Sequence, residues 1–379
     1  MKKDETGFLS PSQLAALSSA ESELFVKFCP GTGYRQSQPE PGSRAVLDPM
    51  WGPIVATRDG WALDESIRHH GSSGGTLTAL AAFLLAAGKV DAVVGVTGSS
   101  SDAFGNDSVV IRDSADVGLL SGSRYSPADP FTSIRDVATT DRVAVIGKPC
   151  DIAALRSLRD ADASKLPKIE YFLSFFCAGT PGWRGTESVI DELKVPRVEI
   201  RTIRYRGDGW PGYFTATANN GATARMTYED SWGKTLNRHL HTRCKVCQDG
   251  MGVHADIVAA DSWDSDERGY PVFDDGEGRS FLISRTSRGE KLLREADGRA
   301  ISTLATQLGR LRAIQPSQEK RKKFAAYRAI GFALGGRSMP RFRGFSRFRW
   351  IATAPREALA QALGSFRRAR ADRHSEKLR

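Results

Sequence analysis

The sequence predicts an α/β protein with a mixed, largely parallel sheet and flanking helices. Units of strand, loop and helix follow one another along the chain, which is typical of parallel strands joined by crossover helices. After about residue 200 polar and apolar residues alternate, which indicates an antiparallel hairpin region. A basic stretch with helical character closes the chain. We therefore expect a mixed sheet, an antiparallel hairpin region and a helical basic C-terminal tail.

Three segments carry the strand–loop–helix pattern. In "GSSGGTLTALAAFLLAAGKVDAVVGV" a glycine loop precedes an apolar helix that ends at Gly88, and a buried strand follows at 90–96. "RVAVIGKPCDIAALRSLR" places a strand at 143–146 before a tight turn and a helix. "IEYFLSFFCAGTPGWRGTESVIDEL" repeats the plan, with an apolar strand that runs into Cys177. These segments predict the parallel part of the sheet.

The remaining elements are a hairpin and two strands. "EIRTIRYRGDGWPGYFTATANNGATARMTYED" alternates in polarity and has a hairpin turn signal at 219–221. "ADIVAADSW" predicts a strand, and "RSFLISRTSRGEKLLREA" predicts a strand that leads into a helix. We divide the chain into an N-terminal extension (1–57), two parts of the α/β region (58–140 and 141–300) and a basic helical tail (301–379).

Composition and charge restrict the class of protein. The 379 residues are 40% hydrophobic and 26% charged, as in ordinary globular proteins. The first residues lack the apolar core of a signal peptide, and the longest apolar run (79–87) is too short to span a membrane. We therefore expect a cytoplasmic protein. In that reducing compartment, five cysteines are expected to be ligands or buried thiols rather than disulfides.

The positive charge is concentrated at the C-terminus. Residues 321–379 hold sixteen Lys and Arg against three acids, a net of +13, so the rest of the chain is −3 within the total of +10. Phe342, Phe345 and Phe348 recur every third residue among arginines, which predicts one aromatic side of a helix. Such a tail suits an anionic membrane surface at the inner face or an acidic partner. A solvated appendage is the alternative, and without a base-reading module we expect no nucleic acid.

Four of the five cysteines form a candidate ligand set. Cys244 and Cys247 make a CxxC pair, whereas Cys150 and Cys177 each follow a predicted strand. Strand ends of a parallel sheet share one edge, so these four thiols could meet at one site. Tetrahedral sulfur ligation suits zinc or an iron–sulfur cluster.

A zinc site is the alternative for the CxxC pair. There, Cys150 and Cys177 would be buried free thiols, and His241 and His254 would complete the zinc ligands. Spacing alone does not separate the two interpretations.

A family resemblance favours one of the two interpretations, which the spacing alone does not. "GSSGG", "KVDAVVGV", "GKPCDIAALR", "FFCAGTPG", "CKVCQDGMGVHADIVAADSW" and "EGRSFLISRTSRGEKLL" come in this order. Over about 60–300 the chain resembles the beta subunits of hydrogenases and dehydrogenases that use coenzyme F420, a 5-deazaflavin. That family includes chlorophyll-pathway reductases and members beside bacterial polysaccharide genes, so polysaccharide biosynthesis is one context in which to expect this chain.

The resemblance implies two cofactors and an activity. It implies FAD and a [4Fe-4S] cluster with electron transfer between them, flavin binding in 58–140 and iron–sulfur and flavin binding in 141–300. The implied function is an iron–sulfur flavoprotein oxidoreductase acting on an organic substrate, and the rival is a non-redox zinc protein whose basic tail binds an anionic polymer or membrane. The implied cluster ligands are Cys150, Cys177, Cys244 and Cys247.

The chain also departs from the family pattern. Many relatives carry a ferredoxin-like run of cysteines near the N-terminus, whereas only Cys29 stands there here. We therefore expect no second cluster, and electrons should arrive from ferredoxin, F420 or another reduced cofactor. Lys148 precedes Pro149–Cys150 and adds a positive charge, which should raise the reduction potential of the cluster.

The glycine loop is the candidate flavin phosphate site. Backbone N–H groups at its glycines and the start of the following helix favour an anion, although such a loop is as often a simple helix cap. The paired histidines before it are candidates for proton delivery, with solvation or capping as the alternative. The residues concerned are His69, His70, Gly71, Ser72, Ser73, Gly74, Gly75 and Thr76.

We assign three further residues to the flavin pocket. Asp256 and Asp261 lie in "ADIVAADSW" and could line the same pocket, where an Asp at the end of a strand could hold ribitol or a flavin ring N–H. Arg285 could offset the charge of a diphosphate or a reduced flavin. The alternatives are a turn or capping role for the aspartates and a surface ion pair for the arginine. Trp210 and Tyr213 could stack on a ring or simply hold a turn.

Overall fold

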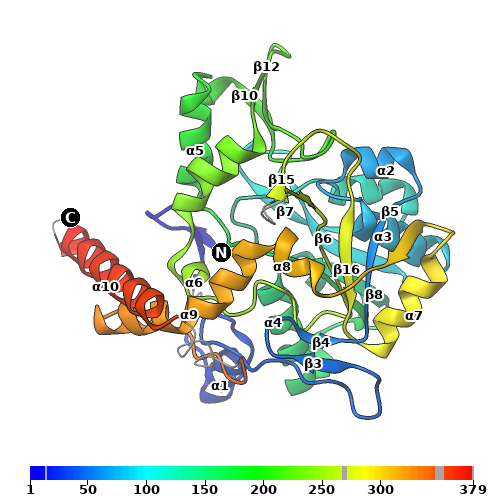
Figure 1. Cartoon of the computed structure of the whole chain (residues 1–379), viewed down its shortest axis with the longest axis horizontal. Helices are drawn as coiled ribbons and strands as arrows, with labels where there is room; N and C mark the ends of the chain where they lie inside the picture. Colours follow the sequence, from blue (N-terminus) through cyan, green and yellow to red (C-terminus); the bar gives the residue numbers. More distant parts are fainter. Residues whose placement is uncertain (13–14, 131, 267–270, 346–353, 378–379) are drawn as a thin grey trace.

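A mixed sheet of eight strands forms the centre of the structure (Figure 1). The structure is a computed structural model that describes residues 1–12, 15–130, 132–266, 271–345 and 354–377. In spatial order the strands are β17 (Ile301–Ala305), β5 (Ala56–Ala62), β16 (Ser280–Ser284), β13 (Ile257–Asp261), β9 (Lys168–Phe175), β8 (Arg142–Gly147), β6 (Ala92–Gly98) and β7 (Asn106–Ile111).

Parallel pairing is confined to the middle of this sheet. β13, β9, β8 and β6 pair in parallel with one another. On one side β16, β5 and β17, and on the other side β7, each pair antiparallel with the preceding strand in the sheet. The carboxyl ends of the four parallel strands therefore meet at one edge, where α/β proteins place their ligands. The predicted mixed α/β class is confirmed.

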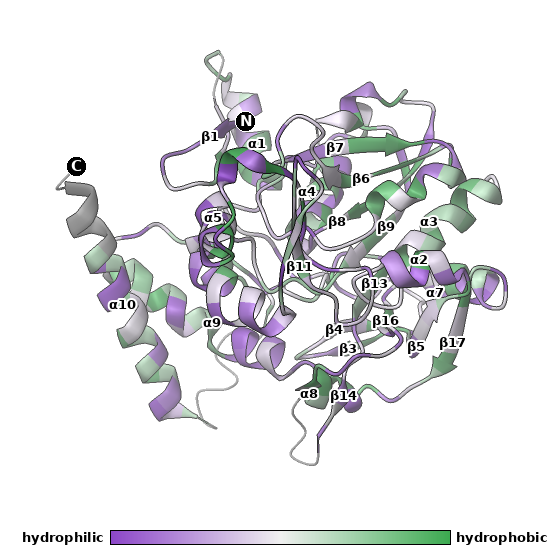
Figure 2. Cartoon of the chain, turned by 90° about the horizontal axis from the view of Figure 1, so that it is seen from above, coloured by the Kyte–Doolittle hydropathy of each residue, from purple (hydrophilic) through white to green (hydrophobic). Residues whose placement is uncertain are grey.

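Helices cover the sheet because their apolar sides pack against its buried strands. α3 (Thr76–Ala86) buries Leu80 and Leu84 completely, in one cluster with Val93 and Leu282 of the sheet. Figure 2 shows apolar residues gathered along the central strands and hydrophilic residues along many of the outer helices. The other helices against the sheet are α2 (Glu65–His70), α4 (Pro149–Ala161) and α7 (Ser287–Ala296).

The expected hairpin region forms a small separate sheet of β10 (Ile200–Arg204), β11 (Phe214–Ala218) and β12 (Thr223–Met226). β11 and β12 pair antiparallel, and Gly221 in their turn has a φ of +85°, which favours glycine. Phe214 is buried with Val189 and Ile190 of α5 (Trp183–Glu192). The predicted turn at 219–221 is confirmed.

Short elements complete the chain. The strands are β1 (Lys2–Lys3), β2 (Leu9–Ser10), β3 (Val46–Asp48), β4 (Gly52–Ile54), β14 (Asp264–Ser265) and β15 (Pro271–Val272). The helices are α1 (Ser19–Phe28), α6 (Thr242–Lys245), α8 (Arg310–Ile314), 3-10 turns at Ser114–Leu120, Ser133–Asp136, Ala163–Lys165, Arg197–Glu199 and Leu236–His239, and a π-helix at Glu229–Thr235.

The C-terminal region is helical only in part. β17 (Ile301–Ala305) pairs with β5, so the first residues assigned to the tail belong to the main sheet. α9 (Pro316–Leu334) and α10 (Pro355–Lys377) lie side by side and project from the body (Figure 1). None of the helices described is long and apolar enough to cross a bilayer.

The aromatic residues between these two helices do not form the expected helical side. The segment before residue 346 is not helical, and it returns to the body, where Phe342 and Phe345 are 3% and 1% exposed. Both rings pack edge-on against Tyr34. The expectation of an exposed aromatic stripe is therefore wrong for these two residues, and Phe348 lies outside the described residues.

Candidate functional site

The cysteine after each of two parallel strands lies at the same edge of the sheet. β8 and β9 are paired in parallel up to Gly147 and Ser174, so the chain leaves both strands at one level. Cys150 lies in the first turn of α4, whose entry from β8 is made by the Pro149 turn. Cys177 follows β9, and its N–H donates to the Gly250 carbonyl at 2.8 Å.

The CxxC pair completes a common cavity. Cys244 lies in α6, and Cys247 follows in the turn after it. The structure thus brings the four predicted ligands together from three segments of the chain. The cavity is lined by Pro30, Tyr34, Pro149, Cys150, Cys177, Gly179, Thr180, Arg243, Cys244, Cys247, Asp249, Arg321 and Phe342.

Backbone groups approach the sulfur atoms closely. The N–H groups of Gly179 and Thr180 donate to the Sγ atoms of Cys177 and Cys244, each at 3.4 Å. Gly179 has a φ of +119°, and a side chain there would contact Leu240 and the Cβ of Cys244 at about 3 Å. A glycine is therefore required where the backbone passes the thiols.

Burial raises the pKa of three of these thiols. It raises the pKa of Cys177 to about 11 and that of Cys247 to about 12, and the pKa of Cys150 lies well above the ordinary value for the same reason. Iron would replace the thiol protons on binding, since only thiolates are ligands.

Two arginines, Arg243 and Arg321, line the cavity of the thiols. Burial would lower the pKa of Arg243, but the nearby Cys150, Cys244 and Cys247 raise it more, so the guanidinium stays charged. Arg321 donates to the carbonyls of Ala178 and Cys244. Charges of this sign offset the negative charge that four thiolates bring to a metal site.

Lys148 lies beside the cavity, as expected. It is the N-terminal cap of α4, and its Nζ lies 2.8 Å from the Asp151 carboxylate. Burial alone would lower the pKa of Lys148, but Asp151, Cys150 and Cys177 together raise it. The ammonium group therefore remains charged next to the candidate ligands.

The two histidines of the zinc alternative do not join the thiols. Nδ1 of His241 accepts from the Arg243 N–H at 3.0 Å, and Nε2 of His254 lies 2.8 Å from the Arg35 carbonyl oxygen. Within the described part of the chain no group of three or more His, Cys, Asp or Glu residues, the four thiols included, is placed to hold a single metal ion. The thiols line one cavity from different sides, which suits a polynuclear cluster whose irons each take a different thiolate.

The glycine loop connects α2 to α3 and packs tightly on the sheet. Ser73 donates to the Arg279 carbonyl at 2.8 Å, and the Gly74 N–H donates to the Ser280 hydroxyl at 3.1 Å. A Cβ on Gly74 would lie 2.6 Å from the Gly60 carbonyl oxygen, and Gly75 has a φ of +69°. Part of the glycine pattern is thus explained by packing.

Unpaired donors remain at this loop. The hydroxyls of Ser72 and Thr76 are buried and have no hydrogen-bond partner among the described residues. α3 has eleven residues, and its cap, Gly75, supplies no side-chain hydrogen bond. Buried hydroxyls normally find a partner, so two unpaired ones at an uncapped helix start fit an anion such as a phosphate.

The histidine pair lies on the exposed last turn of α2. Nδ1 of His70 lies 2.6 Å from the Asp208 carboxylate, and the Gly209 N–H donates to the His69 carbonyl at 3.0 Å. The pair therefore connects the glycine loop to the 207–209 turn that follows β10.

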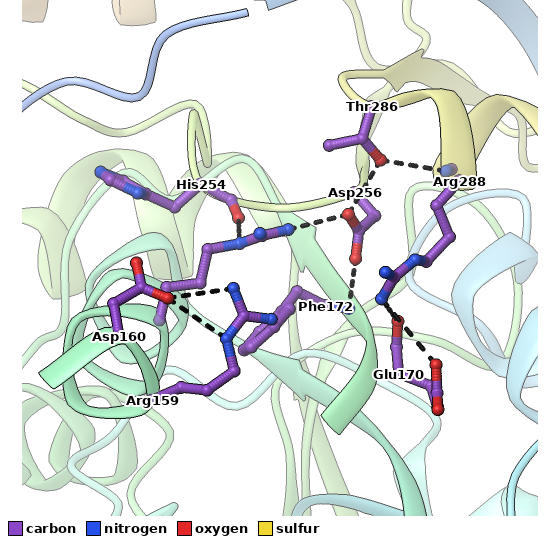
Figure 3. Close-up of polar contacts among 10 residues, drawn as sticks. Arg159, Asp160, Glu170, Phe172, His254, Asp256, Thr286 and Arg288 are labelled. Atoms are coloured by element: carbon purple, nitrogen blue, oxygen red, sulfur yellow. Dashed lines mark hydrogen bonds and ion pairs between the residues drawn. The ribbon is translucent and has the colours of Figure 1, made fainter. Parts of the chain in front are cut away.

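The two aspartates lie at opposite ends of β13 and cannot share one pocket. Asp256 precedes the strand and is 2% exposed. Its carboxylate accepts from Arg156, Thr286 and the Phe172 N–H, each at 2.8 Å (Figure 3). Asp256 therefore serves the framework, and the flavin role expected for it stays a prediction.

Asp261 ends β13 at the same edge of the sheet as the thiols. It accepts from Nη1 of Arg206 at 2.9 Å. The Arg206 guanidinium also lies 4.5 Å from the ring centre of Tyr228 and 5.2 Å from that of Trp263. Sequence reasoning missed Arg206, whose only signal was a charged residue before Gly207 in "RYRGDGW".

Arg285 is buried among backbone carbonyls. It is 2% exposed, and its guanidinium donates to the carbonyls of Trp51, Pro53 and Met251 at 2.6–2.8 Å. Burial lowers its pKa to about 10. The side chain braces three backbone segments, and the flavin role expected for it stays a prediction.

The aromatic residues of the "GDGWPGYF" segment separate. Trp210 packs on Trp263 with ring centres 4.1 Å apart, whereas Tyr213 is 42% exposed and lines a different cavity. The two rings therefore do not form one stacking surface.

Comparison with known proteins places the chain in a family. Residues 58–135 match the N-terminal part and residues 140–306 the C-terminal part of the coenzyme F420 hydrogenase/dehydrogenase beta subunit family, together more than half of the chain. The chain belongs to this family. Its members are oxidoreductases, and the recognition made from the motifs is confirmed.

The chain spans only part of the length of the relatives that it matches. A coenzyme F420-dependent sulfite reductase from Methanocaldococcus jannaschii is 25% identical over 240 residues, 59% of this chain and 34% of the relative. An F420-dependent formate dehydrogenase 1 beta subunit from Methanococcus maripaludis is 25% identical over 243 residues, 62% of this chain and 58% of the relative.

One solved structure shares the fold. A chain of the F420-reducing [NiFe] hydrogenase complex from Methanosarcina barkeri aligns with a TM-score of 0.58 at 21% identity. The alignment covers 76% of this chain and 96% of that chain. The likeness supports the fold of the body described above.

Proposed function

We propose that this chain is an iron–sulfur flavoprotein oxidoreductase that passes electrons between a [4Fe-4S] cluster and FAD during oxidation or reduction of an organic substrate. The observation that carries the proposal is the common cavity of Cys150, Cys177, Cys244 and Cys247. When bound, the cluster supplies one-electron steps and the flavin supplies hydride exchange, so together they link one-electron and two-electron reactants.

The residues around the thiols suit a buried, anionic cluster. Arg243 and Lys148 remain charged beside the thiols and would offset the charge of the ligands. The N–H groups of Gly179 and Thr180 would donate to ligand sulfurs, which raises the reduction potential of a cluster. Phe342 closes the cavity and would keep water from the iron.

The loop of residues 71–76 would hold a phosphate of the FAD. Ser72 and Thr76 would donate their unpaired hydroxyls, and the start of α3 would add its N–H groups. Asp261, at the edge shared with the thiols, is the carboxylate that remains available to a flavin. We assign proton delivery to His69 and His70, which directly precede the loop.

The electron carrier is proposed from the relatives. The sulfite reductase and formate dehydrogenase relatives are named as F420-dependent, so F420 is the first candidate carrier, followed by ferredoxin and reduced nicotinamides. Bound flavin in anaerobic protein would be mixed with each reduced carrier in turn. Rapid bleaching of the flavin band by one carrier identifies it.

Anaerobic purification tests the proposal itself. The protein should be brown, with iron, acid-labile sulfide and acid-extractable flavin in each preparation. A colourless protein that contains one zinc and no flavin would replace the redox proposal with a structural metal site.

A further inference from the structure

A second cavity lies between the small sheet and the end of β6. Its volume is about 280 Å³, enough for a compact oxyanion and part of the molecule that carries it. β10 and β11 form its floor with three threonines, and Tyr213 stands at its side. The charged lining residues are Arg124, Arg204, Asp208 and Arg225.

The cavity has an excess of positive charge. Arg124 donates to the Ile203 carbonyl at 3.1 Å, and within the described residues no carboxylate pairs with Arg124 or Arg225. Asp208 is already engaged, at 3.0 Å from Nε of Arg204 and 2.6 Å from Nδ1 of His70. Burial, and to a smaller degree the charge of Arg204, lowers the pKa of Arg124. A bound anion would favour the charged form of Arg124 and offset the repulsion from Arg204.

The arginines are fixed in place by close packing. The Arg124 guanidinium occupies the space of a side chain on Gly98 at the end of β6, where a Cβ would lie 2.5 Å from Nη2. Arg204 contacts Gly207 in the same way, and its Nη2 donates to the His70 carbonyl. His70 directly precedes the glycine loop, so the cavity borders the proposed flavin site.

We infer that this cavity binds the phosphate or carboxylate group of the organic reactant that exchanges electrons with the flavin. The inference rests on the proposed function for the identity of the reaction but not for the binding of an anion. Arg124 and Arg225 supply the charge, and Tyr213 and the threonine hydroxyls supply neutral donors.

The test is calorimetric titration of the full-length protein with inorganic phosphate and, separately, with succinate. Arg124→Gln should weaken binding of the preferred anion at least tenfold, because it removes a half-buried charge from the cavity. Arg201→Gln is the matched control, since Arg201 is an exposed arginine of β10 that does not line the cavity. The anion that binds more tightly identifies the group as phosphate or carboxylate.

Other outcomes would overturn either the anion site or the proposed function. No binding of either anion, or equal weakening by the two variants, would show that the cavity has no specific anion site. Loss of flavin from Arg124→Gln would assign the cavity to the flavin instead. A protein without iron and flavin that still shows Arg124-dependent binding would refute the proposed function and leave the anion site intact.

The paired C-terminal helices carry an independent second inference. Gly331 and Gly335 of α9 meet Ala362 and Ala369 of α10, so the two helices run in the same direction at close contact. On one side of this contact Arg328 donates to Gln361 at 3.2 Å. Phe332 on that side is buried with Val246 of the body.

The opposite side of the helix pair is apolar and exposed. Ile330 and Leu334 are 41% and 73% exposed, and Leu359 and Leu363 are 61% and 47% exposed. Spacing by four residues places each pair on one helical face. Measured from the glycine contact, both faces point away from Arg328 and Gln361, so the four side chains form one apolar face on the pair.

Exposed arginines border this apolar face. Arg356, Arg367 and Arg370 are exposed on the same side of α10, each three to seven residues from the nearer of Leu359 and Leu363. Glu319 and Glu357 of the helix pair are already engaged, since they pair with Lys323 and Lys320. Leucines flanked by arginines are typical of helices that lie on anionic lipid.

We propose that this face, made of Ile330, Leu334, Leu359 and Leu363 with the bordering arginines, docks on an anionic lipid surface. The leucines would enter the acyl boundary, and the arginines would contact lipid phosphates. This surface replaces the aromatic stripe expected from the sequence, because Phe342 and Phe345 are buried.

Flotation of the full-length protein with vesicles tests the surface. Binding is expected to vesicles of phosphatidylcholine with 30% phosphatidylglycerol, to fall with salt, and to be absent from pure phosphatidylcholine. Leu359→Ser with Leu363→Ser should weaken binding at least tenfold. Leu304→Ser is the control, since Leu304 is 60% exposed on β17 of the body. Equal binding by both variants, or no binding by the unchanged protein, would overturn the lipid surface in favour of a protein partner.

Discussion

The two ends of β13 carry carboxylates with opposite surroundings. Asp256 at the amino end is 2% exposed and accepts three hydrogen bonds, from Arg156, Thr286 and the Phe172 N–H (Figure 3). Asp261 at the carboxyl end has a side chain 20% exposed and a single charged partner, Arg206. Asp256 is therefore a structural carboxylate, whereas Asp261, five positions later, lies at the edge of the sheet where α/β proteins place their ligands.

The same division extends along the sheet. Cys150 and Cys177 follow the carboxyl ends of β8 and β9, whereas the Arg142–Asp91 pair lies at the amino ends of β8 and β6. Parallel strands leave loops free at their carboxyl edge, and this edge is where α/β proteins place chemistry. The amino edge is used for hydrogen bonds that hold the framework.

The largest effect on stability is expected at the amino end of β13. Asp256→Asn should lower the free energy of unfolding by about 3–5 kcal/mol, because the amide cannot accept all three hydrogen bonds and leaves Arg156 without its charge partner. Asp261→Asn should cost less, about 2–3 kcal/mol, because its oxygen can still accept from Arg206 although the buried guanidinium loses its charge partner. Chemical denaturation of both variants measures the difference, and equal losses would remove the distinction between the two ends.

Phe342 tests whether the C-terminal segment belongs to the cofactor edge. Phe342→Ala should cost about 3 kcal/mol and lower iron retention, because the ring is 3% exposed and walls the thiol cavity. Leu334→Ala on the exposed helix face should change the unfolding free energy by less than about 0.5 kcal/mol. Iron analysis and denaturation apply to both variants. Full iron content in Phe342→Ala would show that this segment packs on the site without protecting it.

Acid should lower the stability of the fold by protonating a second framework carboxylate, Glu290. Burial would raise the pKa of Glu290, but hydrogen bonds from Arg58, Arg294 and Ser284 lower it to about 2. Because the folded pKa lies below the unfolded value, the stabilisation is complete above pH 4.5 and is lost as the pH falls towards 2.

Glu290→Gln checks this pH dependence. The variant should be less stable than the unchanged protein at pH 7, and the difference should shrink steadily between pH 4.5 and 2.5. Denaturant unfolding at several pH values measures it. A constant difference over this range would show that Glu290 does not titrate with a lowered pKa.

Local patterns predicted the elements and the thiols well. Apolar runs followed by glycine loops identified the strands and helices of the α/β units, and strand ends with a CxxC pair indicated a common site for Cys150, Cys177, Cys244 and Cys247. Both signals are local, because strand direction alone decides which edge a following residue occupies.

The residues whose surroundings the sequence did not predict make contacts with residues distant in the sequence. Asp256 and Arg285 were assigned to a flavin pocket because polarity does not reveal that a side chain is committed to the framework. Phe342 looked like part of an amphipathic helix, but the chain turns back to Tyr34 more than 300 residues earlier. Periodicity carries no information on such a return.

Metal analysis of single cysteine variants tests the central claim most directly. Anaerobically purified protein should contain about four irons and about four sulfides per chain. Cys177→Ser should lower both severely, whereas Cys29→Ser should leave both unchanged, because Cys29 does not line the four-thiol cavity. Iron lost from Cys29→Ser and retained in Cys177→Ser, or one zinc in place of iron in the unchanged protein, would contradict the assignment.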